Sequence, residues 1–296
     1  MDVTTTTVGR ILTRASGYVA PVASHTLQPY GGCALGNSLC GVGCYVRGSW
    51  FVTRGREWGG YVEVRANAAE AYRAESACER KWAGRSGRPF GIFMSSATEP
   101  FQPAERKYHV TRSVLEAMIE RPPDVLIVQS HSHHVADYLD LYPALAKRCD
   151  LRFHVSIESD RDRLPGLPPP ASSVEKRLAA ASALKAAGLR VVATLSPLHP
   201  IDNPDRFFAR LARTMDAIVI DHFITGDGTP TGARTLRTAM PLAMAAVEPA
   251  SVTLAYRDRI VEIARQHMPG RVGVGVDGFA GIFLPAARAP VASAAG

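Results

Sequence analysis

Two kinds of segment alternate along most of the chain, and this alternation constrains the fold more than any other feature. Short runs rich in β-branched and aromatic residues are separated by longer segments with helical periodicity. Strands that alternate with single helices pair in parallel through right-handed crossovers. The expected strands are residues 89–95, 125–129, 151–157, 189–195, 217–220 and 271–276, and the expected helices are residues 68–82, 107–120, 135–148, 172–187, 204–214 and 257–267.

This pattern indicates an α/β fold with a parallel sheet. Five or six strand–helix units fit either a doubly wound sheet or a partial barrel. In both architectures ligands bind at the carboxyl ends of the strands. Polar residues directly after a strand are therefore the candidates for a functional site.

The pattern favours one main domain over residues 25–285. Residues 1–24 precede it as an N-terminal extension, and the small residues of 286–296 predict a flexible tail. Residues 47–65 contain aromatic and β-branched residues around a central Gly-Gly, which favours a β-hairpin excursion from the domain.

Composition sets loose limits on the partners. The net charge is +7, and the basic residues form no long block, so an acidic partner is permitted but not required. No run approaches the roughly 18 apolar residues of a membrane helix, and the N-terminus shows no apolar signal region. We expect a cytoplasmic protein with no membrane partner.

Three of the five cysteines fall close together, within a glycine-rich stretch. Cys33, Cys40 and Cys44 lie in the segment LQPYGGCALGNSLCGVGCYVR, whereas Cys78 and Cys149 stand apart and are expected to be structural. Clustered thiols in a long chain favour a metal or iron–sulfur site over a disulfide framework. Thiolates suit zinc and iron–sulfur clusters, and glycines let a short loop turn so that several thiolates converge.

The cysteines alone leave three interpretations. Three thiolates leave one iron of a 4Fe–4S cluster free to bind a ligand. A closed zinc site needs a fourth ligand, which His25, Cys78 or Cys149 could supply. The third interpretation is three unrelated buried cysteines.

Several segments in order carry a resemblance to a known family. The stretch from Pro29 to Cys33, followed by Cys40 and by Cys44-Tyr45-Val46-Arg47, resembles the cluster loop of radical S-adenosylmethionine proteins, in the branch of spore photoproduct lyase. Residues 94–115, 128–141, 154–158 and 173–195 are similar to later strand ends and helices of that branch. The likeness spans roughly residues 25–225. It implies a partial (β/α)6 barrel of the TIM type, with parallel strands and outer helices.

Two features depart from the family pattern. The family usually places three and then two residues between its cysteines, whereas this chain places six and then three. The lyase itself would carry a hydrogen-donating cysteine near the second strand end, where this chain has Ser95-Ser96-Ala97-Thr98. Repair of the spore lesion is therefore not the expected reaction.

The resemblance implies an enzyme with two cofactors. Cys33, Cys40 and Cys44 would hold a 4Fe–4S cluster whose free iron binds S-adenosylmethionine. With one electron from an external reductant, the cofactor would be cleaved to a 5′-deoxyadenosyl radical that abstracts hydrogen from an unidentified substrate. The protein would supply positioning and exclude water.

Polar residues after the strands are the candidate contacts to S-adenosylmethionine. Glu99 and Thr98, with Ser95 or Ser96, are expected at the amino group. Ser156 and Glu158 alternate onto one side of a strand and, with Ser130, are expected near the ribose and carboxylate. The remaining candidates are Tyr45 near the adenine, His199 after the fifth strand, and, as loop residues near cofactor or substrate, His131, His133, His134, Asp221 and His222.

Three function classes remain at this point. A small molecule or peptide is the favoured substrate of the radical enzyme. A nucleic-acid lesion lyase or modifying enzyme of the same chemistry is the alternative that the basic charge supports. A non-enzymatic zinc or iron–sulfur binding protein is the third class.

Overall fold

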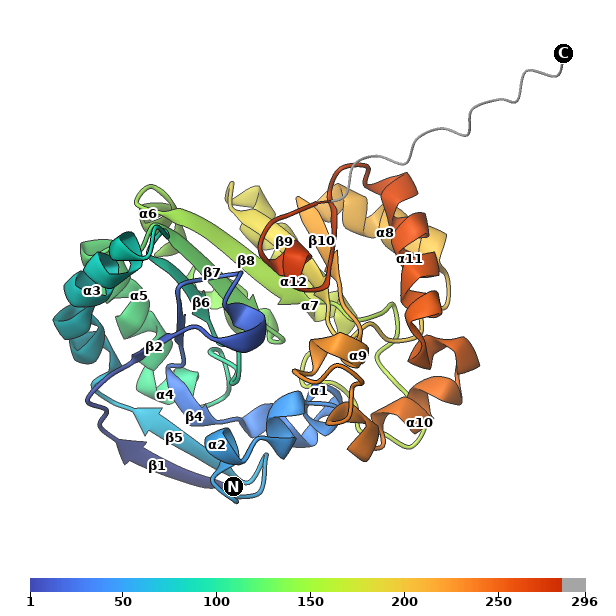
Figure 1. The fold of residues 1–296 in the computed structure, drawn as a ribbon, viewed down its shortest axis with the longest axis horizontal. Helices are drawn as coiled ribbons and strands as arrows, with labels where there is room; N and C mark the ends of the chain where they lie inside the picture. Colours follow the sequence, from blue (N-terminus) through green and yellow to red (C-terminus); the bar gives the residue numbers. More distant parts are fainter. Residues whose placement is uncertain (284–296) are drawn as a thin grey trace, which may run out of the picture.

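A mainly parallel sheet forms the centre of the molecule (Figure 1). The computed structural model describes residues 1–283. Every neighbouring pair in the sheet is parallel except β2–β3 at one edge. In spatial order the strands are β11 (Val272–Val274), β10 (Ala217–Ile220), β9 (Arg190–Leu195), β8 (Asp150–Ser156), β7 (Val125–Ser130), β6 (Gly91–Met94), β3 (His25–Leu27) and β2 (Leu12–Arg14).

At least one helix lies along the chain between each parallel strand and the next, as the alternation predicts. The α/β fold class and all six expected strands are confirmed, and β3, whose residues His-Thr-Leu form no apolar run, adds a seventh parallel strand. The crossover helices are α3 (Ala68–Arg85), α5 (Val110–Glu120), α6 (Tyr142–Ala146), α7 (Val174–Ala186), α8 (Pro204–Thr214) and α11 (Leu254–His267).

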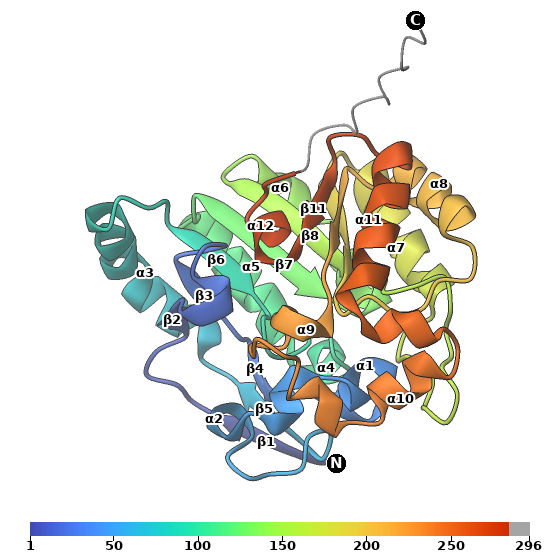
Figure 2. The ribbon, with the colours of Figure 1, turned by 45° about the vertical axis from the view of Figure 1, so that its right-hand side comes forward.

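Alternate residues of each strand enter two different cores. Ile92 and Met94 of β6 pack in the large core, which also contains residues of the crossover helices. Phe93, between them, points to the inner face. There it joins Phe279 of α12 (Gly275–Phe279), the short helix that lies across the inner face in Figure 2. The inside of the partial barrel is therefore filled near α12.

A second, smaller sheet corrects the expected hairpin over residues 47–65. That segment contains two short helical turns, among them α2 (Trp50–Thr53), and only one strand, β5 (Tyr61–Arg65). β5 pairs in parallel with β1 (Asp2–Thr6) and antiparallel with β4 (Tyr30–Gly32). The hairpin prediction is wrong because the partners of β5 come from outside the segment.

Two expected helices are interrupted. His109 adopts a left-handed conformation with φ 51°, which separates α4 (Glu105–Tyr108) from α5 within the expected helix 107–120. The expected helix 135–148 is a 3-10 helix over His133–Tyr138 followed by α6. Pro143 cannot donate a backbone hydrogen bond inside a continuous helix but fits the first turn of a new one.

The segment before residue 25 belongs to both sheets, through β1 and β2. The expected tail at 286–296 lies outside the described residues, and the division into an extension and a domain stays a prediction. None of the helices within residues 1–283 has the length and apolar character needed to cross a membrane.

Candidate active site

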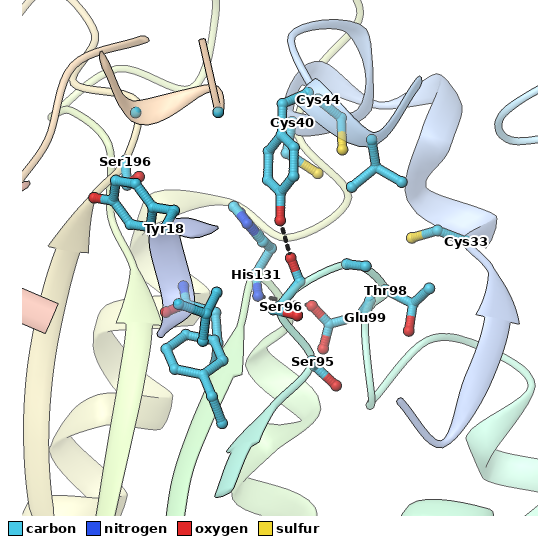
Figure 3. A pocket seen from close by; sticks show the side chains of 18 of the residues that line it. Tyr18, Cys33, Cys40, Cys44, Ser95, Ser96, Thr98, Glu99, His131 and Ser196 are labelled. Carbon is cyan, nitrogen blue, oxygen red and sulfur yellow. Dashed lines mark hydrogen bonds between the residues drawn. The ribbon is translucent and has the colours of Figure 1, made fainter. Parts of the chain in front are cut away.

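The three clustered cysteines line one cavity of about 470 Å³ (Figure 3). Cys33 directly follows β4 and precedes a 3-10 turn over Ala34–Asn37. Cys40 lies in α1 (Leu39–Val42), and Cys44 precedes another 3-10 turn. The six residues between Cys33 and Cys40, an unusual spacing, therefore form a compact turn and the start of α1. All three thiols still line the cavity.

Close backbone approach holds this cysteine loop together. A Cβ atom added at Gly41 would lie 2.3 Å from the carbonyl carbon and oxygen of Gly36, so only glycine fits there. The Arg47 guanidinium donates to the same two residues, with Nη2 2.8 Å from the Gly36 oxygen and Nε 3.3 Å from the Gly41 oxygen. These contacts fold the two cysteine turns onto each other.

The surroundings of the thiols fit an iron–sulfur cluster. Burial raises the pKa of all three thiols, that of Cys33 to about 12, while backbone N–H groups at Cys33 and Cys44 oppose the rise. Such donors suit sulfur atoms that carry negative charge. Within residues 1–283, no three His, Cys, Asp or Glu side chains are placed to share one metal ion, so a zinc site gains no support. A cluster spreads its three thiolates over three irons and needs no such convergence.

Glu99 faces the same cavity and is held in place by three donors. Its Oε1 accepts from Ser130 Oγ at 2.7 Å and from the Phe101 N–H at 3.1 Å, and its Oε2 accepts from the His131 N–H at 2.7 Å. Burial raises the pKa of Glu99. A carboxylate has about four acceptor positions, so one remains for a ligand.

The other residues after β6 also reach the cavity. Ser95 lines it with φ 71°, an unusual conformation for a non-glycine residue, and its buried hydroxyl has no hydrogen-bond partner. Ser96 and Thr98 line it too, but Gln28 hydrogen-bonds both side chains. The Tyr45 hydroxyl donates to the Ser96 carbonyl, so the cysteine loop is tied to the end of β6.

Four predicted contacts lie outside the wall of the main cavity. Ser130 is fully buried and supports Glu99, and Ser156 is fully buried behind Gln129, whose Nε2 donates to it at 2.7 Å. Glu158 and His199 line a neighbouring cavity of about 110 Å³ that also reaches Cys40 and Cys44. These four residues are therefore not all in reach of one ligand.

Charge pairing distinguishes Glu158 from Glu99. Burial disfavours the charged form of Glu158. Arg177 at 2.6 Å and His131 at 2.9 Å nevertheless hold the pKa of Glu158 well below its ordinary value. Burial lowers the pKa of nearby His199 to about 4, and its buried Nε2 has no hydrogen-bond partner.

His131 lines both cavities, whereas its neighbours turn away. His133 Nδ1 lies 2.8 Å from Ser172 Oγ. His134 Nδ1 lies 2.8 Å from Asp137 Oδ2. The structure thus places one of the three histidines at the site.

The wall of the cavity away from the cysteines includes a residue that sequence reasoning missed. Tyr18 donates to Asp221 Oδ2 at 2.9 Å, and Ser196 Oγ lies 3.3 Å from the same oxygen. Burial raises the pKa of Asp221 to about 6. Figure 3 shows Tyr18 beside Ser196, across the cavity from the cysteine loop. Tyr18 comes from the segment 1–24, where no pattern in the sequence marks a site.

Comparison with known proteins supports the fold. Neither a known protein family nor a curated protein matches the sequence. Solved structures of spore photoproduct lyase match the structure over 92% of this chain and 81% of theirs: a mutant with TM-score 0.62 and 16% identity, the enzyme complexed with dinucleoside spore photoproduct with 0.62 and 17%, and a mutant with bound AdoMet and dinucleoside spore photoproduct with 0.59 and 18%. The resemblance stated from sequence is thus confirmed at the level of the fold.

Proposed function

We propose that this chain is a radical S-adenosylmethionine enzyme. One observation carries the proposal: the thiols of Cys33, Cys40 and Cys44 and the carboxylate of Glu99 line a single cavity at the carboxyl ends of the parallel strands. The fold shared with spore photoproduct lyase supports it. A bound 4Fe–4S cluster would supply the electron that cleaves S-adenosylmethionine into methionine and a 5′-deoxyadenosyl radical, which takes a hydrogen atom from the substrate.

The chain's own residues bind and orient the cofactor. The three thiolates would hold the cluster, and with three protein ligands one iron would stay free for the amino and carboxylate groups of S-adenosylmethionine. Glu99 would accept from an N–H of that amino group, because Glu99 lines the cavity while Ser130 and the His131 N–H fix its orientation. Ser95 lines the same cavity, while its hydroxyl is buried in the wall.

The substrate binds at the cavity wall away from the cysteines. Phe93 and Phe279 supply apolar surface there, and Tyr18, Ser196 and Asp221 supply polar groups. This mixture suits a small molecule or peptide, since apolar walls exclude water while a few polar groups set orientation. An external one-electron reductant completes the reaction, and the cytoplasm is the compartment in which the thiols stay reduced.

A nucleic-acid-derived substrate is the second candidate. A matching structure of spore photoproduct lyase contains dinucleoside spore photoproduct, and this chain carries a net charge of +7. Binding to an acidic polymer weakens steeply with salt, because bound phosphates release counterions. Salt-dependent binding of single-stranded or duplex DNA would favour this candidate, and salt-independent failure to bind would favour the small molecule or peptide.

Metal loading of two cysteine variants tests the proposal. We expect anaerobic reconstitution to give about four irons and four sulfides per chain in the native protein, and a clear loss in Cys40→Ala. Cys78→Ala is the matched control, because Cys78 is exposed on α3 away from the cavity. Equal iron in all three proteins, or a colourless native protein that holds zinc, would contradict the proposal.

A further inference from the structure

Trp58 packs against the cysteine loop, and its indole nitrogen has no hydrogen-bond partner. The side chain is 3% exposed and packs in a small apolar cluster with Cys33, Leu35 and Val46, beside the other two clustered cysteines. It also lines the main cavity. No expectation from the sequence involved this residue.

The position of the indole is set by its neighbours. Its ring meets that of Tyr61 edge to face, with centroids 6.5 Å apart. The adjacent Gly59 packs against Gly36 of the cysteine loop so closely that a Cβ on Gly36 would lie 2.5 Å from the Gly59 backbone. Trp58 is thus fixed to the loop that carries the thiols.

The Trp58 N–H has no full hydrogen bond to the protein. Nε1 is buried and lacks a partner. Leaving a buried donor unsatisfied destabilises the folded state, so such groups call for an acceptor that the protein alone does not provide. An acceptor brought by a ligand of the cavity would remove this cost.

The chemistry around the indole points to sulfur as that acceptor. Cys44 packs against the same apolar cluster as Trp58, and its sulfur can accept a hydrogen bond. The rest of its apolar cluster is made of aliphatic side chains and the other cysteines, which offer no oxygen acceptor from their side chains.

We propose that the Trp58 N–H donates a hydrogen bond to a sulfur of the iron–sulfur cluster, either the Cys44 thiolate or an inorganic sulfide, and so raises the reduction potential of the cluster. The inference rests on the proposed function for the presence of the cluster. Reduction adds negative charge that spreads over the sulfurs, so a donor stabilises the reduced form more than the oxidised form. Trp58 is therefore a positioning residue that makes the cluster easier to reduce.

Potentiometric titration of the reconstituted cluster tests this role in Trp58→Phe. Phenylalanine keeps most of the ring volume but lacks the N–H. At a fixed potential near the midpoint we expect about tenfold less reduced cluster relative to oxidised cluster, which corresponds to a midpoint about 59 mV lower. Trp82→Phe is the control, because Trp82 packs on His25 and Arg14 outside the cavity. A midpoint in Trp58→Phe that is unchanged or higher would overturn the proposal.

A spectroscopic measurement keeps the test decisive if Trp58→Phe loads cluster poorly. In the native chain labelled with ¹⁵N at the tryptophan indoles, pulsed electron paramagnetic resonance of the reduced cluster should show a ¹⁵N coupling that Trp82→Phe retains. No coupling in a fully loaded native protein would overturn the Trp58 inference while leaving the proposed function intact. A native protein that takes up no iron would instead overturn the proposed function, and this inference with it.

Discussion

Three buried carboxylates near the cavity show how a neighbouring charge decides protonation. Glu158 has a cationic partner in Arg177, and its pKa falls well below the ordinary value despite burial. Glu99 and Asp221 accept from hydroxyl and backbone N–H groups, so burial prevails and the pKa of each rises. A carboxylate with a cationic partner is thus kept charged, and the two without one are brought closer to neutrality.

Asp221 should make folding less favourable as pH rises. Its pKa is about 6 in the folded chain against an ordinary value of 3.8, so the folded state binds the proton more tightly. Its contribution is fully present below about pH 4 and is lost as pH rises through 6, a change of about 3 kcal/mol. Asp221→Asn does not titrate, so between pH 4 and pH 7 its unfolding free energy should gain about 2 kcal/mol relative to the native protein.

Urea unfolding at several pH values measures this difference. Asp277→Asn is a suitable control, since it makes the same change at an exposed aspartate. The prediction would be contradicted if the difference in unfolding free energy between Asp221→Asn and the native protein stayed constant from pH 4 to pH 7. The pKa of Asp221 would then not be raised by folding.

At the scale of elements, the cysteine loop depends on tight backbone packing more than on regular structure. Its helical pieces, the turn Ala34–Asn37 and α1, are four residues each. The contact between Gly36 and Gly41 therefore sets how the thiols face the cavity.

Gly41→Ala should separate the two turns of the loop. The added Cβ would meet the Gly36 backbone at 2.3 Å, and such overpacking costs about 1–3 kcal/mol. We expect iron uptake on reconstitution to fall severalfold, with little change in far-ultraviolet circular dichroism. Gly48→Ala, four residues after Cys44, is the control because a Cβ there meets nothing within 4 Å. Equal iron content in Gly41→Ala and Gly48→Ala would contradict this prediction, because the loop would then tolerate the added Cβ at residue 41.

The sequence predicts those elements whose signal is local. Runs such as 125–129 and 189–195 are buried strands because their β-branched residues suit a two-sided core, and the structure confirms them. β3 escapes prediction because its residues, His-Thr-Leu, form no apolar run. The 47–65 hairpin fails because β5 takes its partners from distant segments, which periodicity cannot reveal.

The candidate site also contains both residues that the sequence could predict and residues that it could not. Cys33, Cys40, Cys44 and Glu99 could be predicted because they follow strands or share a short segment, and all line the cavity. Whether a strand-end side chain faces a cavity depends on packing, so Ser130 and Ser156 prove to be supporting residues behind it. Trp58 reaches the cavity only through its packing against a glycine turn, and Tyr18 through the path of the N-terminal segment.

At the scale of the whole molecule, one carboxylate fastens the N-terminal segment to the barrel. Glu79 of α3 pairs with Arg10, Arg14 and His25. The pKa of Glu79 falls to about 2, because hydrogen bonds from Arg14 and His25 outweigh burial. This contact fixes the residues on both sides of Tyr18, so it links the edge of the sheet to the wall of the cavity.

Glu79→Ala should loosen this segment. The change leaves the fully buried His25 Nε2 without its acceptor, and we expect the free energy of unfolding to fall by about 1–3 kcal/mol at pH 7. Because the pKa of Glu79 is lowered in the folded state, its contribution is present above about pH 4.5 and is lost as pH falls toward 2. Denaturant unfolding checks this against Glu70→Ala, an exposed change on the same helix. Equal stabilities of the two variants would contradict the role given to Glu79.

Formation of 5′-deoxyadenosine tests the central claim most directly. The native chain, reconstituted anaerobically and reduced with S-adenosylmethionine, should produce it even without the substrate, while Cys40→Ala should not and Cys78→Ala should match the native chain. This pattern would establish that the thiols at the cavity support reductive cleavage of the cofactor. A native protein that carries its full iron content and yet yields no 5′-deoxyadenosine under reduction would contradict the account.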